Sequence, residues 1–169
     1  MKIPLWVSVV VVIATILHCK VGNDQKLGRV QTVWGSGKFN SQTWMDIWTA
    51  DHFVLGMVWE KFISNIFKTE WAFIMLVVFA CSFEMIENKS WLIGVWNQSN
   101  YSGDGIINSL CDILAAILGY AFAKHLSFHA GIGIIIGLLI LIPIIRPLLF
   151  RTKSIRPWAG MKFLKIFQT

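Results

Sequence analysis

The sequence predicts an all-α membrane protein, a single domain over residues 1–169 folded as a polytopic bundle of about five transmembrane helices. Hydrophobic residues make up 56% of the chain and charged residues only 14%, whereas soluble domains carry about 25% charged residues. The mean hydropathy is +0.63. The nine tryptophans suit the membrane–water interface, where an indole ring is half buried. These three observations favour a membrane protein over a soluble globule.

The first predicted helix covers about residues 3–19. This run contains no Asp, Glu, Lys or Arg, and Lys2 and Lys20 bracket it. Its length is near the lower limit for a membrane span. A cleaved signal peptide is the alternative, with Lys2 as its basic start. The segment Leu17-His18-Cys19 lacks the small residues of a cleavage site, which favours an uncleaved helix.

The second and third predicted helices cover about residues 49–67 and 71–88. The second is the least apolar, since Asp51, His52, Glu60 and Lys61 lie in it. A span with charges must be screened by neighbouring helices or lie partly in the interface. The third is apolar until its end, where Glu84, Glu87 and Asn88 have the i, i+3, i+4 spacing that places side chains on one helix face.

The fourth and fifth predicted helices cover about residues 104–123 and 128–150. The fifth contains Gly133 and Gly137, a four-residue spacing that favours close packing between apolar helices. We therefore expect this glycine face to contact another helix. The last segment, 151–169, mixes basic and apolar side chains and is typical of an interfacial segment.

The fourth helix carries the most informative pattern. Asp104, Asn108 and Asp112 are spaced by four residues, which places them on one stripe of an α-helix. Charged groups in membrane helices are costly and usually face a bundle interior or a wet cavity. Asp112 is eight residues beyond Asp104, about 12 Å further along the helix. Asp112 is therefore predicted to be the deepest polar residue of an internal site.

Antiparallel threading brings the start of the second helix, the end of the third and the start of the fourth to the same side of the membrane. The polar side chains at these ends are predicted to form a funnel that narrows toward Asp112. The candidate ligand-binding residues are Asp51, His52, Glu84, Glu87, Asn88, Asp104, Asn108 and Asp112. For residues at helix ends, simple solvation at the interface is the competing interpretation.

The distribution of basic residues predicts the orientation. With five spans, ten Lys and Arg lie on the side that includes the C-terminal segment, and three lie on the other. The positive-inside rule then places the C-terminus in the cytoplasm. Cleavage of the first helix would favour the opposite orientation. The net charge of +6 is attributed to anionic lipids rather than nucleic acid, because the basic residues flank apolar segments.

The motifs that would identify a reaction are missing from the sequence. There is no zinc-binding motif, Ser-His-Asp arrangement or phosphate-binding loop, so we predict no cofactor and no metal. We expect the funnel to bind a small polar or lipid-like ligand. The alternatives are an interfacial acid–base or metal-dependent enzyme, in which the acids and His52 would do the chemistry, and a structural or assembly subunit.

Three blocks of sequence carry a family resemblance, which covers about residues 33–125. The first contains Asp46, Thr49, His52 and Gly56. The second is Phe83-Glu84-Met85-Ile86-Glu87-Asn88. The third and most specific is Tyr101-Ser-Gly-Asp104-Gly-Ile-Ile-Asn108-Ser-Leu-Cys-Asp112. With these blocks the chain resembles an uncharacterised family of bacterial inner-membrane proteins related to the VanZ-like group. The resemblance implies a helical membrane fold and a role in the cell envelope, without an established activity.

Overall fold

The computed structural model describes residues 9, 12–13, 44–87 and 104–149. Four α-helices and one short 3₁₀ turn account for the last two ranges. They are α2 (Ile47–Phe62), η2 (Ile63–Asn65), α3 (Thr69–Glu87), α5 (Ile106–Lys124) and α6 (Phe128–Leu149). The predicted helix 3–19 lies almost entirely outside the described residues, and the interfacial segment 151–169 lies wholly outside them.

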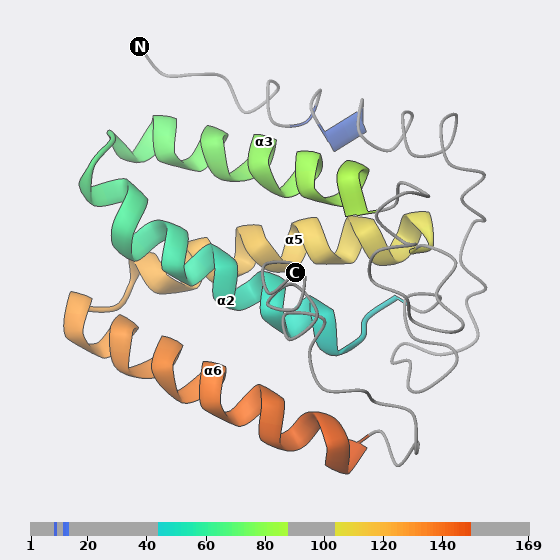
Figure 1. The fold of residues 1–169 in the computed structure, drawn as a ribbon. Helices are drawn as coiled ribbons and strands as arrows, with labels where there is room; N and C mark the ends of the chain where they lie inside the picture. Colours follow the sequence, from blue (N-terminus) through green and yellow to red (C-terminus); the bar gives the residue numbers. More distant parts are fainter. Residues whose placement is uncertain (1–8, 10–11, 14–43, 88–103, 150–169) are drawn as a thin grey trace, which may run out of the picture.

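The four helices pack as an antiparallel bundle, with α5 beside both α2 and α3 (Figure 1). The beginnings of α2 and α5 lie at the same end of the bundle as the ends of α3 and α6 (Figure 1). We call this end the acidic end, because it contains Asp46, Glu84, Glu87, Asp104 and Asp112. The threading predicted from the sequence is confirmed for these four helices.

Three of the helices have the length and apolar composition needed to cross a membrane: Thr69–Glu87, Ile106–Lys124 and Phe128–Ile145. The expected all-helical membrane fold is thus supported, whereas the count of about five spans stays a prediction. Helix α2 has only 16 residues and includes Asp51, Glu60 and Lys61. It is therefore shorter than the span predicted at 49–67, because the chain tightens into η2 after Phe62.

Helix α2 begins where the side chain of Asp46 can cap it. Asp46 Oδ1 accepts hydrogen bonds from the backbone N–H groups of Trp48 and Thr49, at 2.8 and 3.3 Å. In return, the Thr49 hydroxyl accepts from the Asp46 N–H at 3.1 Å. This reciprocal capping box satisfies donors that the first turn leaves unpaired. It fixes the start of α2 at Ile47, two residues before the predicted position.

The tightest contact in the bundle is between α2 and α5, at Gly56 and Gly119. A Cβ atom built on Gly56 would lie 1.9 Å from the backbone oxygen of Ala116, and one on Gly119 would lie 1.9 Å from that of Phe53. Both positions therefore require glycine if the two backbones are to touch. This close approach brings the polar stripe of α5 against the first turns of α2.

The expected contact of the Gly133/Gly137 face is wrong for the described part of the chain. Among the described residues, no atom lies within 4 Å of a Cβ atom built at either glycine. Helix α6 turns another face inward, on which Gly131, Ile135 and Ile142 are buried. The glycine spacing predicts a flat surface, but the bulkier apolar residues decide which face packs against the bundle.

Two apolar clusters hold the helices together. One joins α2, α5 and α6 through Val54, Met57, Ala123, Ile135 and Ile142. The other lies on α3 and α5 and contains Leu76, Val77, Ala80, Cys81, Ile113, Ala116 and Tyr120. Large apolar side chains also cover the outer faces of α3 and α6, as expected for helices in contact with lipid.

Polar contacts fasten the end of the bundle opposite the acidic end. The Lys61 ammonium donates to the backbone oxygen of Leu126 at 2.9 Å and pairs with Glu60 at 2.9 Å. The Tyr120 hydroxyl lies 3.0 Å from the Ser64 hydroxyl and 3.1 Å from the Thr69 carbonyl oxygen. Trp59 Nε1 donates to the Ala72 carbonyl at 2.8 Å. These bonds tie α2 and η2 to α3, to α5 and to the turn between α5 and α6.

Candidate functional site: a buried acidic cluster

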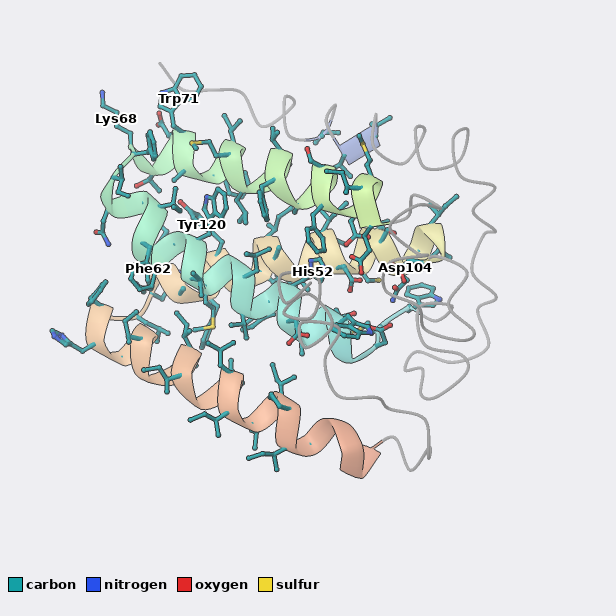
Figure 2. All side chains as sticks on the ribbon, in the orientation of Figure 1. His52, Phe62, Lys68, Trp71, Asp104 and Tyr120 are labelled. Atoms are coloured by element: carbon teal, nitrogen blue, oxygen red, sulfur yellow. The ribbon has the colours of Figure 1, made fainter. Side chains whose placement is uncertain are left out.

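Helices α2, α3 and α5 bring a histidine and several acids together at the acidic end. His52 and Asp104 lie toward this end of the bundle, whereas Lys68 and Trp71 lie at the opposite end (Figure 2). The side chains of Asp46, Glu84, Asp104 and Asp112 are each at most 6% exposed, and Glu87 is half-buried. These five carboxyl groups, together with His52 and Asn108, form what we call the acidic cluster.

The acids are close enough to act on one another electrostatically. Glu84 interacts with Asp112, Asp104 and Glu87. Asp46 interacts with Glu87 and with Asp112. Carboxylates buried together at low dielectric repel one another, so the folded protein must neutralise part of this charge with protons or a cation.

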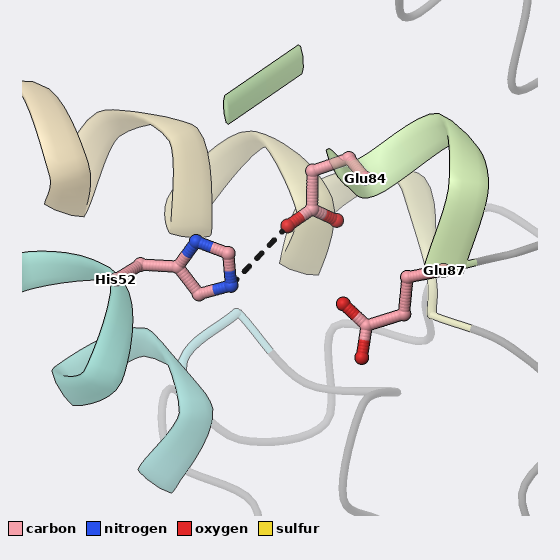
Figure 3. A group of neighbouring side chains, drawn as sticks. All are labelled: His52, Glu84 and Glu87. Atoms are coloured by element: carbon pink, nitrogen blue, oxygen red, sulfur yellow. Dashed lines mark ion pairs between the residues drawn. The ribbon is translucent and has the colours of Figure 1, made fainter. Parts of the chain in front are cut away.

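His52 contributes the imidazole nitrogens of the cluster. Its Nε2 atom lies 3.4 Å from Glu84 Oε1 (Figure 3). The ring makes an edge-on contact with Phe83, with 5.7 Å between the ring centroids. His52 is 6% exposed, and its Nδ1 atom has no hydrogen-bond partner within the described residues. The imidazole is thus held in place by packing and directed at the carboxyl groups of α3.

The stripe predicted on α5 faces the cluster and is almost completely enclosed. Asn108 is 0% exposed and Asp112 is 2% exposed. Within the part of the chain that the structure describes, both amide atoms of Asn108 and the Oδ1 atom of Asp112 lack hydrogen-bond partners. The Thr49 hydroxyl bonds to Asp112. The interior of the cluster therefore contains polar atoms that its own side chains leave unsatisfied.

Six of the eight predicted site residues meet in this cluster: His52, Glu84, Glu87, Asp104, Asn108 and Asp112. Asn88 lies outside the described residues. Asp51 lies elsewhere, half-buried in a groove of about 310 Å³ between α2 and α6. The groove is otherwise apolar and is lined by Asp51, Val54, Leu55, Val58, Leu139, Ile142 and Pro143. Asp51 and His52 are consecutive on a helix, so their side chains leave the axis about 100° apart.

Sequence reasoning left two residues out of the site, Asp46 and Thr49. Both belong to the capping box that begins α2, and both also interact with Asp112. The signal that could have found them is the pair Asp46 and Thr49 itself. An Asp three residues before a Thr, followed by an apolar run, indicates a helix start. Placing that start at Ile47 would have brought both side chains to the acidic end.

Comparisons with known proteins indicate an uncharacterised family. The chain is 27% identical over 146 residues to a "UPF0314 protein" of Paracoccus denitrificans (strain Pd 1222), an alignment that covers 79% of this chain and 76% of the relative. No solved structure matches. A family model described as "Protein of unknown function (DUF2585)" matches residues 12–151. The expected uncharacterised family is thereby confirmed, while the link to the VanZ-like group stays a prediction. Because the family model matches most of the length of the chain, the chain belongs to the DUF2585 family.

Proposed function

We propose that the protein is a membrane binding protein that takes up a positively charged polar ligand in the acidic cluster. The observation that carries this proposal is the convergence of five carboxyl groups, from the ends of three helices and the chain before them, around His52 and Asn108. Such a cluster attracts cations and repels anions such as phosphate. A lipid-like ligand would fit only through a cationic group.

The unsatisfied polar atoms favour ligand binding over a purely structural role. A polar network that only holds helices together is stable when its members are saturated with hydrogen bonds. Here the Asn108 amide and Asp112 Oδ1 are buried without partners in the described residues. A bound ligand would supply the missing partners and the missing positive charge.

The surroundings of the site follow from the sequence. We infer a bacterial inner-membrane location and a role in the cell envelope from the VanZ-like resemblance alone. The C-terminus is cytoplasmic by the ten-to-three distribution of Lys and Arg. The acidic end then faces the cytoplasm, because the predicted loops before α2 and between α3 and α5 lie on the same side of the membrane as the C-terminus. Alkaline-phosphatase and fluorescent-protein fusions after Thr169 test this orientation. An active phosphatase with a dark fluorophore reverses it.

The binding proposal is tested by ligand-dependent stabilisation. The tag-free protein in detergent is heated with spermidine plus a chelator, with Mn²⁺, or with phosphate, and unfolding is followed by tryptophan emission. A ligand that binds only the folded state at a hundred times its Kd stabilises it by about 2.7 kcal/mol. We expect at least one of the two cations to raise the melting temperature, and phosphate to leave it unchanged.

Matched variants show which residues the ligand-dependent stabilisation requires. Asp104→Asn and Asp112→Asn remove charge from the acidic cluster, whereas Glu70→Gln removes the same charge from an exposed position at the other end of α3. We expect only the first two to abolish the stabilisation. The proposal fails if neither cation stabilises the wild type, or if Glu70→Gln lowers the effect as much as the cluster variants do.

A further inference from the structure

We propose that the cationic ligand is a divalent first-row transition-metal ion, of the class of Mn²⁺, Fe²⁺ or Zn²⁺, bound by His52, Glu84 and Glu87. The inference rests on the proposed function, since it names the ligand of the same cluster. These three side chains each offer one ligand atom, and the three atoms lie within 4.8 Å of one another. Figure 3 shows His52 reaching from α2 toward the two glutamates of α3.

The spacing of the first two ligands already suits a metal. Ligand atoms bound at about 2.1 Å to a tetrahedral ion are separated by about 3.4 Å. His52 Nε2 and Glu84 Oε1 lie 3.4 Å apart. Glu87 is three residues after Glu84, on the same face of α3, and is half-buried where Glu84 is fully buried. Its carboxylate therefore has room to move the remaining distance to the ion.

The buried polar atoms around these ligands are an independent indication of a bound ion. Asn108, Asp112 and His52 are each more than nine-tenths buried. Within the described chain, both amide atoms of Asn108, the Oδ1 atom of Asp112 and the Nδ1 atom of His52 lack hydrogen-bond partners. Asp112 interacts electrostatically with both Glu84 and Glu87. Metal-bound waters are strong donors and could satisfy Asp112 and the Asn108 oxygen, as outer-shell partners do in known sites.

The ligand types select the class of metal. An imidazole nitrogen suits zinc, iron and related transition metals, whereas magnesium and calcium prefer sites made only of oxygen. The two glutamates balance the charge of a divalent ion. Three protein ligands leave at least one coordination position open to water or to a further ligand. A metal at this place would thus also neutralise the centre of the acidic cluster.

Metal binding by the whole chain tests the inference. The protein is purified in detergent, its affinity tag is removed, and it is stripped with a chelator. It is then dialysed against Mn²⁺, Zn²⁺, Co²⁺ or Mg²⁺, and bound metal is measured by elemental analysis. We expect one transition-metal ion per chain and much weaker retention of Mg²⁺. We expect His52→Gln and Glu87→Gln to lower the affinity by about tenfold or more, because even outer-shell substitutions cost about 10–100-fold.

Controls separate a true site from a general effect of charge or folding. His129→Gln and Glu70→Gln remove the same side-chain types from exposed positions and should bind metal like the wild type. The visible absorption of bound Co²⁺ should change in His52→Gln, which a nonspecific acidic surface would not cause. Glu87→Gln, at the less buried ligand, keeps the test valid if His52→Gln fails to fold.

Two results would overturn the metal assignment. One is equal transition-metal binding by the site variants and the exposed controls. The other is a wild type that binds no transition metal under these conditions. If spermidine still stabilises the wild type, and Asp104→Asn abolishes that stabilisation, the proposed cation-binding function stands while the metal is excluded. If no cation stabilises the protein at all, both proposals fail.

Discussion

Replacing Gly119 with alanine tests the closest contact of the bundle. A Cβ atom there would lie 1.9 Å from the Phe53 carbonyl oxygen, and real Cβ atoms essentially never approach within 3.0 Å of such an atom. Helices α2 and α5 would have to separate by at least 1.1 Å. A gap of about 0.5–1 Å already forfeits a quarter to a half of each dispersion contact across an interface.

The expected change in the free energy of unfolding follows from two opposing effects. Overpacking a well-packed interior costs about 1–3 kcal/mol, and a clash with backbone places this case at the upper end. Exchanging glycine for alanine within a helix returns about 1 kcal/mol through the backbone. We therefore expect Gly119→Ala to lower the free energy of unfolding by about 2 kcal/mol, and Gly56→Ala to behave similarly.

The matched control is Gly137→Ala on α6, where no described residue lies within 4 Å of the added atom. This variant gains the higher helix propensity of alanine without a steric clash. Its free energy of unfolding should therefore be unchanged or higher by up to about 1 kcal/mol. Reversible unfolding by sodium dodecyl sulfate in mixed micelles, followed by tryptophan emission, measures all three variants. If Gly119→Ala is as stable as Gly137→Ala, the two backbones do not touch and the packing of α2 on α5 is wrong.

Three further substitutions probe the cap, the opposite end and the acidic cluster. Asp46→Ala removes the capping box of α2 and should cost about 1 kcal/mol of unfolding free energy; an unchanged value would mean that α2 does not begin at Ile47. Tyr120→Phe loses the hydroxyl that bonds to Ser64 and Thr69 and should cost about 0.5–1.5 kcal/mol in the same titration; an unchanged value would mean that these bonds do not contribute to stability. Asp112→Asn keeps the shape and the acceptor for the Thr49 hydroxyl, so it should be more stable than Asp112→Leu by about 1–3 kcal/mol. Equal melting temperatures of these two variants would show that Asp112 makes no buried polar contact.

Hydrophobic patterning made most of the helices predictable. The apolar runs placed α3, α5 and α6 to within two residues at each end, because each run is bounded by polar residues. The end of helix α2 was harder to predict, since the charges of Glu60 and Lys61 interrupt the apolar pattern near the point where the helix ends. Lys61 is buried and bonds to the Leu126 carbonyl. The position of the Lys61 side chain depends on Leu126, which is far along the chain, and hydrophobic periodicity does not encode such a contact.

The candidate site was likewise predictable only in part. The placement of Asn108 and Asp112 required only the helical period, whereas Asp104 lies two residues before α5 begins, outside the helix predicted to start there. The antiparallel threading brought Glu84 and Glu87 to the same end. The glycine contact was not predictable in this way. Gly133 and Gly137 have the familiar spacing, yet Gly56 and Gly119 make the contact from two different helices. Pairing single glycines across helices requires the relative rotation of both, which one sequence does not supply.

The contact of Gly56 with α5 also has a mechanical consequence. Beyond it, toward η2, hydrogen bonds from Trp59, Lys61 and Tyr120 anchor α2 and the turn after it. Before it, α2 and its cap continue for ten residues to Asp46, a distance of about 15 Å at helical rise. A tilt of about 5° at this fulcrum displaces the Asp46 end by about 1.3 Å but moves His52 by only about 0.5 Å. A small tilt of α2 would thus move the Asp46 carboxyl relative to the rest of the acidic cluster while the His52–Glu84 spacing is nearly preserved.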